Sequence, residues 1–71
     1  MNEYAVTFFL PYGTVTVEFQ SAVKFVTEAN QEELAEAASK IFRSAYGLDL
    51  LLFAQDFNID VVYEHKEGEM V

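Results

Sequence analysis

The stretch that decides the fold is YAVTFFLPYGTVTVEFQ, residues 4–20. Its first half alternates so that four side chains would face one side of a strand and Phe9 the other. Its second half alternates apolar and polar residues, which is typical of a half-buried strand. The apolar sets are Tyr4, Val6, Phe8 and Leu10, then Val15, Val17 and Phe19. Residues 11–14 suit a turn, because Pro fixes φ and Gly permits positive φ. The stretch therefore predicts an antiparallel hairpin.

The alternation does not stop at Gln20. Val23 and Phe25 keep the same parity, and Ser21 interrupts it. We therefore expect the second strand to reach about Thr27 with a bend or bulge near Ser21. Because so long an unbroken strand is unusual, a break into two shorter strands is the alternative.

A helix is predicted from Asn30 to about Tyr46. Asn30 can accept from the first free helical N–H groups, and Glu33 at the third helical position approximates a capping box. Gly47 is placed to end the helix as its C′ residue. The apolar stripe of this helix comprises Leu34, Ala37, Ala38, Ile41, Phe42 and Ala45.

Residues 48–57 leave two interpretations open. Residues 50–53 could form a buried strand or a short helix capped by Asp49, and their Leu and Ala content slightly favours the helix. Residues 58–65 predict a further strand with Ile59, Val61 and Tyr63 on one face, and residues 66–71 a polar tail that frays. The expected fold is α+β, in the order β-β-α-(short α)-β. A three-stranded antiparallel sheet carries one main helix on a face, in a single domain of residues 1–71.

The composition combines strong acidity with a large apolar fraction. Twelve acids against four bases give a formal net charge of -8, yet 52% of the 71 residues are hydrophobic, with seven Phe and four Tyr. A disordered acidic tail would be polar and poor in aromatics, so this chain should fold. A domain this small has limited interior, and the apolar excess predicts a homodimer. Candidates for the dimer interface are Phe9, Tyr12, Phe53 and Phe57.

Several classes of protein are disfavoured. The chain has no cysteine, its N-terminus lacks a basic signal-peptide region, and its longest apolar run, residues 50–54, is too short for a membrane span. We therefore expect a cytoplasmic protein. His65 is the only histidine, and no catalytic constellation, phosphate loop, metal-ligand spacing or cofactor motif accompanies it. Four bases cannot offset repulsion from phosphates, so direct nucleic-acid binding is disfavoured.

Some of the acids have local structural explanations. Glu32 and Glu33 fall in the first helical turn, Glu36 pairs with Lys40 at i,i+4, and Asp49 is a candidate cap. The acids that such roles leave unexplained include the candidate partner-binding set: Glu18, Glu28, Asp56, Asp60, Glu64 and Glu67. A merely solubilising acidic surface is the alternative explanation.

In size, charge and folded character the chain resembles the small acidic bacteriophage proteins that inhibit host factors. Some of these proteins block histone-like HU proteins, and others block repair, restriction or transcription enzymes. The resemblance covers the whole chain, is compositional, and carries over no family residues. It implies an inhibitor without catalysis, acting in the host cytoplasm if the chain is phage-encoded. We expect it to mimic DNA and occupy the DNA-binding surface of a basic protein. The alternative is a structural or adaptor subunit that acts through an apolar interface.

Overall fold

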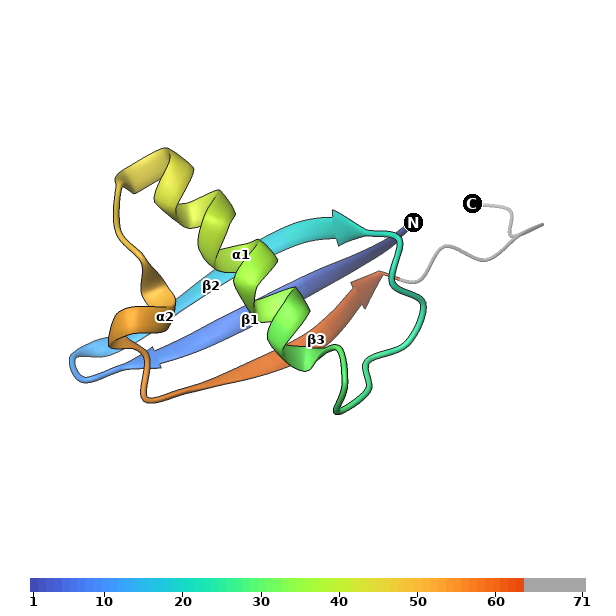
Figure 1. The fold of residues 1–71 in the computed structure, drawn as a ribbon, viewed down its shortest axis with the longest axis horizontal. Coiled ribbons are helices and arrows are strands. Elements are labelled where there is room, and N and C mark those ends of the chain that lie inside the picture. The colour runs from blue at the N-terminus through green and yellow to red at the C-terminus, as the bar shows by residue number, and fades with distance from the viewer. Residues whose placement is uncertain (64–71) are drawn as a thin grey trace.

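The fold is a three-stranded antiparallel sheet carrying one long helix, as predicted. The computed structural model describes residues 1–63 (Figure 1). The elements in chain order are β1 (Asn2–Leu10), β2 (Gly13–Ser21), α1 (Gln31–Tyr46), α2 (Leu50–Phe53) and β3 (Asp56–Tyr63). The strand order is β2-β1-β3, so β1 is central and both other strands are edges.

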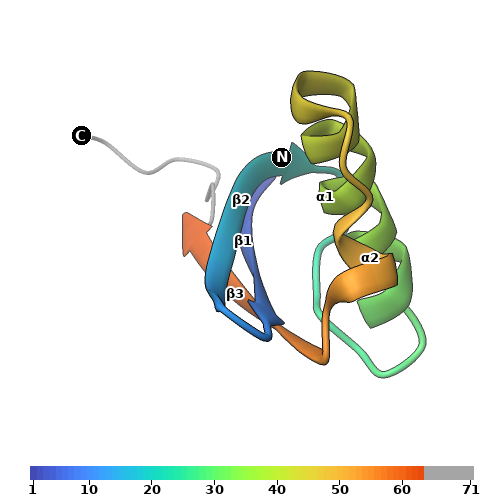
Figure 2. The same cartoon turned by 90° about the vertical axis from the view of Figure 1, so that its left-hand side faces the viewer.

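The helices lie together on one face of the sheet (Figure 2). Beneath them β1 buries Tyr4, Val6 and Phe8 completely. Val6 and Phe8 belong to a core cluster that also contains Val17 of β2, Ala35 and Ala38 of α1, and Leu50 of α2. Partly buried apolar residues pack around this cluster: Leu10, Val15, Phe19, Phe42, Ala54, Phe57 and Ile59. The alternation of residues 4–20 therefore identified the buried face correctly.

The hairpin closes at the Leu10–Gly13 pair and continues to the Asn2–Ser21 pair. β2 ends at Ser21, so the prediction that it runs to about Thr27 was wrong. The reason is that β1 begins at Asn2, and beyond that point β2 has no neighbour with which to pair. Side chains of β1 hold the loop that follows: the Tyr4 hydroxyl donates to the carbonyl oxygen of Val23, and Asn2 Nδ2 donates to that of Lys24 at 3.1 Å.

The ends of α1 confirm one predicted signal and correct another. Gly47 has φ of 76° and donates its N–H to the Arg43 carbonyl oxygen at 2.7 Å, as a C′ glycine should. Asn30 stands at the N-cap position, but its side chain makes no capping hydrogen bond. Asn30 Oδ1 instead accepts from the Thr27 N–H at 2.8 Å, and Nδ2 donates to the Phe25 carbonyl oxygen at 2.7 Å. Asn30 thus shapes the loop that leads into α1.

The ambiguous segment contains the short helix α2 rather than a strand. Asp49 Oδ1 accepts from the Leu51 N–H at 3.2 Å, which caps α2, and from Ser39 Oγ at 2.8 Å, which ties α2 to α1. Leu50 then enters the core. β3 begins at Asp56, two residues before its predicted start, and the end of the predicted strand at His65 lies outside the described residues.

The two leucines of α2 offer a matched test of this packing. Leu50 is 0% exposed and Leu52 is 77% exposed. Leu50→Ala should lower the free energy of unfolding by about 2–5 kcal/mol, because it empties a core position. Leu52→Ala should change it by less than about 0.5 kcal/mol, because the side chain is already in water. Urea denaturation followed by circular dichroism measures both values, and equal losses would contradict this placement of α2.

Candidate functional site

Within residues 1–63, no element covers the face of the sheet opposite the helices, and we call this face the open face. Successive side chains of a strand point to opposite faces, so the residues that alternate with the core positions belong to this face. On β1, on β2 and on the part of β3 that precedes the irregularity of its ladder with β1, they are Glu3, Ala5, Thr7 and Phe9, then Thr14, Thr16, Glu18 and Gln20, then Asp56, Asn58 and Asp60. Four of the eleven are carboxylates.

Three of these carboxylates surround Ala5. Glu18 and Asp60 both pair with Ala5, one from each neighbouring strand. Two strand spacings put Glu18 and Asp60 about 10 Å apart. Glu3 pairs with Gln20, so it lies diagonally from Glu18, about 7–8 Å away. The small side chain of Ala5 leaves the three acids free to project without a bulky group between them.

The strands that form the open face carry no cationic side chain. None of the residues in β1, β2 and β3 is Lys or Arg. The bases within residues 1–63 are Lys24 in the loop after β2, and Lys40 and Arg43 on α1. Within residues 1–63, the sheet therefore separates a face whose charged side chains are all acidic from the side of the molecule on which α1 mixes both signs of charge.

The polar side chains of the open face form local hydrogen bonds within the sheet. Thr7 Oγ1 and Thr16 Oγ1 lie 2.9 Å apart across the β1–β2 pair. Asn58 Nδ2 donates to Asp60 Oδ2 at 3.2 Å, and the Phe57 N–H donates to Asp56 Oδ1 at 2.8 Å. These contacts orient the carboxylates of Asp56 and Asp60 on the sheet.

The structure brings together only part of the predicted acidic set. Glu18, Asp56 and Asp60 share the open face, whereas Glu28 lies in the loop of residues 22–30, which passes to the helix side (Figure 2). Glu64 and Glu67 lie outside the described residues. Glu3 belongs to the site but was not in the predicted set. Its parity, shared with Ala5 and Thr7, was the signal that could have placed it there.

The predicted interface aromatics are dispersed. Phe9 lies on the open face, Tyr12 in the hairpin turn and Phe53 on α2, and all three are exposed. Phe57 points to the helix side, half-buried beside Phe8 with ring centroids 6.4 Å apart. These four residues therefore do not form one surface.

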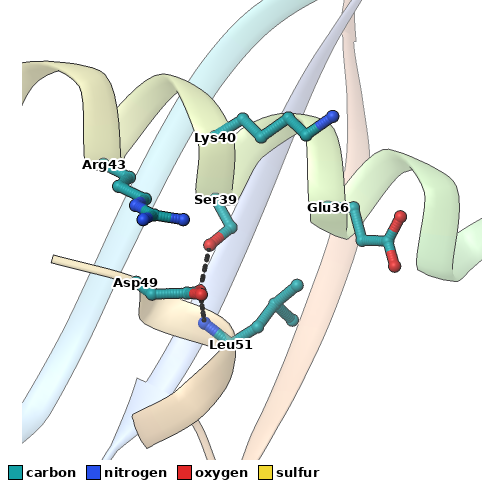
Figure 3. A pocket seen from close by; sticks show the side chains of 6 residues that line it. All are labelled: Glu36, Ser39, Lys40, Arg43, Asp49 and Leu51. Atoms are coloured by element: carbon teal, nitrogen blue, oxygen red, sulfur yellow. Dashed lines mark hydrogen bonds between the residues drawn. The ribbon is translucent and has the colours of Figure 1, made fainter.

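A shallow hollow lies between α1 and α2 (Figure 3). It encloses about 330 Å³ and is lined by Glu36, Ser39, Lys40, Arg43, Asp49 and Leu51. An adjoining hollow of about 270 Å³ is lined by Glu32, Ala35, Glu36, Leu51 and Phe57. The bonds of Asp49 to Ser39 and Leu51 give its carboxylate a structural role, and the remaining charges are of mixed sign. The open face is accordingly the more distinctive feature.

Three further observations bear on function. Within residues 1–63, no group of three or more His, Cys, Asp or Glu side chains is placed to hold a metal ion. No helix in this part of the chain has the length and apolarity needed to span a membrane. Comparisons with protein-family models, curated proteins and solved structures find no match to this chain.

The open face should cost the fold stability, since its like charges repel one another. In low salt, the double variant Glu18→Gln, Asp60→Asn should raise the free energy of unfolding by about 0.4 kcal/mol, the Coulomb energy of two like unit charges about 10 Å apart in water. Glu33 provides the control, because an acid in the first turn of α1 interacts favourably with the helix dipole. Glu33→Gln should lower the same free energy by about 0.5 kcal/mol.

Thermal unfolding at low and high salt measures both effects. Added salt should shrink both differences, because it screens exposed charges. If the double variant and Glu33→Gln shift the free energy of unfolding equally and in the same direction, the open face is not a site of charge repulsion.

Proposed function

We propose that this protein is a non-enzymatic binding protein that presents the open face to the DNA-binding surface of a basic protein. It acts by occupying that surface in place of DNA. The observation that carries the proposal is the open face itself: within residues 1–63, its strands place four carboxylates and no Lys or Arg on one face of the sheet. The proposal places the protein in the cytoplasm, the host's if a phage encodes it.

The spacing of the acids supports a mimic of phosphates. Each strand of B-DNA presents one phosphate per about 3.4 Å of axis, across grooves about 6 and 12 Å wide. The estimated separations of about 7–10 Å among Glu3, Glu18 and Asp60 are of the same order. A groove lined with Lys and Arg to receive phosphates could therefore receive these carboxylates.

The net charge of -8 supports fast and selective association. A rigid, single-signed surface steers an oppositely charged partner during diffusion and repels competitors of its own sign. Because the carboxylates are already fixed on strands, binding orders little additional chain. Selectivity then comes from matching a basic surface, which explains why no reactive group is needed.

An adaptor that uses apolar contacts is the second candidate. It is favoured by exposed apolar side chains on and near α2, among them Leu48, Leu52 and Phe53. On that hypothesis Phe53→Ser abolishes partner binding and charge reversal on the open face does not. On the DNA-mimic hypothesis, charge reversal on the open face abolishes partner binding and Phe53→Ser does not.

The deciding experiment is capture of partners from a bacterial lysate on the immobilised protein. We expect a basic DNA-binding protein that is released by salt and also displaced by duplex DNA, because screened charge pairs hold it. The double reversal Glu18→Lys, Asp60→Lys should abolish the capture. Mass spectrometry identifies the eluted protein, and titration calorimetry with that purified protein measures the affinity.

Glu33→Lys, Glu36→Lys is the matched control. It makes the same change in net charge on α1, across the sheet from the open face, and should retain most of the affinity. Equal losses from the two reversals would mean that net charge alone drives binding. A partner that resists both high salt and duplex DNA would contradict mimicry and favour the adaptor.

A further inference from the structure

We propose that the free edge of β2 is the site at which a second copy of this chain pairs, β2 against β2 and antiparallel. The product is a two-fold symmetric dimer with one continuous six-stranded sheet. The proposal rests on three features: the direction of the backbone groups of β2, the pattern of its side chains, and the position of α1 above its edge.

The backbone of β2 presents an unpaired row of hydrogen-bonding groups. The two-residue turn makes Leu10–Gly13 a hydrogen-bonded pair, and such pairs alternate along an antiparallel ladder. Thr7 and Thr16 then form a non-bonded pair, as their 2.9 Å hydroxyl contact indicates, because side chains approach more closely there. The backbone N–H and C=O groups of Thr14, Thr16, Glu18 and Gln20 therefore face away from β1.

One register satisfies all of these groups at once. With the two-fold axis at Val17, residues 14, 16, 18 and 20 of one copy pair with residues 20, 18, 16 and 14 of the other. On the open face, Glu18 then lies opposite Thr16 of the second copy, so no two acids face each other directly. On the helix side, Val15 lies opposite Phe19 of the second copy and Val17 opposite its own equivalent. β2 is thus complementary to itself in charge and in apolar character.

The position of α1 above β2 leaves room for an additional strand beneath the helix. α1 crosses the sheet obliquely, and its C-terminal half extends beyond the edge of β2 (Figures 1 and 2). The buried residues of α1 are Leu34, Ala35, Ala38 and Ser39, so the sheet-facing stripe includes two residues that the predicted stripe left out. Ile41, seven positions after Leu34 and three after Ala38, borders this stripe and is 46% exposed. Ala45, also in the predicted stripe, is exposed too. The apolar stripe of α1 therefore extends past the edge of the sheet, and a strand added at β2 would lie under the exposed part of that stripe.

The other edge of the sheet is protected against such pairing. β3 carries Asp56 and Asp60, and the ladder between β1 and β3 is irregular at Glu3/Tyr4. Acidic side chains and bulges are devices by which natural sheets blunt their edges. β2, in contrast, has one acid in nine residues, no proline and an unbroken register with β1. The second copy is therefore expected at β2 rather than at β3.

The dimer has a consequence that rests on the proposed function. Because the six strands form one sheet, the two open faces lie on the same side and join into a single acidic surface. Two copies carry a formal charge of -16 (2 × -8). A mimic of DNA gains length in this way, since a duplex is longer than the face that one small domain offers.

Amide hydrogen exchange, measured by NMR over a range of protein concentrations, tests the pairing in the native chain. The amides of Thr14, Thr16, Glu18 and Gln20 should become protected as concentration rises. The amides of Val15, Val17 and Phe19 serve as internal controls, because β1 already protects them in the monomer. Sedimentation equilibrium should show twice the 8.1 kDa chain mass over the same range. A mass that stays at 8.1 kDa, or four outward amides that exchange rapidly in a dimer, would overturn the proposal.

Two variants separate this dimer from others. Thr16→Pro removes an outward N–H and should weaken the dimer at least about tenfold, while Thr16→Val keeps that N–H and should preserve it. If Thr16→Pro fails to fold, Ile41→Lys decides: it should weaken the dimer, whereas Leu52→Lys, on α2, should not. Dimers that survive Ile41→Lys contradict the proposal. A monomeric chain that still binds a DNA-displaceable protein would reject the dimer and leave the proposed function standing. A dimer that binds no such protein would support the dimer and reject the proposed function.

Discussion

The structure depends on one constraint: residues 1–63, the part of the chain that the structure describes, hold a single long helix with which to cover a three-stranded sheet. β1 lies at the centre and buries Tyr4, Val6 and Phe8 beneath the helices. With one face of the sheet closed in this way, its other face must remain compatible with water. The location of the acidic surface follows from that asymmetry, since the alternation of each strand sends every second side chain to the uncovered side.

Local chemistry in the sequence was sufficient for much of this fold. The alternation in residues 4–20, the αL glycine at Gly47 and the cap at Asp49 each depend on neighbours within a few positions. The first two were predicted correctly, and the capped helix was the slightly favoured of two interpretations. The end of β2 could not be predicted in this way. It is set by where β1 begins, nineteen residues away across the Asn2–Ser21 pair. Asn30 was misjudged for a related reason, because loop groups at Thr27 and Phe25 compete for its side chain.

The candidate site was less accessible to sequence reasoning than the fold. Parity placed Glu18 and Asp60 outward, but the order β2-β1-β3 is what puts them on either side of Ala5. No local pattern specifies that order, because it depends on which strand edge β3 reaches after two helices. Glu28 illustrates the converse. It counts equally toward the net charge, yet the loop that carries it passes to the helix side, away from the open face (Figure 2).

Charge and edge chemistry together make the two sides of the sheet unequal. Like charges on the open face work against folding, and a solubilising surface has no need to keep cations off one face, because a surface with both signs interspersed keeps a protein soluble equally well. The same logic applies to the edges. β3 combines two aspartates with an irregular ladder, while β2 spaces its single Glu18 among threonines and glutamine. A chain selected only against aggregation would have blunted both edges. Leaving β2 regular, beneath an overhanging helix with Ile41 uncovered, is consistent with a strand edge that pairs as part of its function.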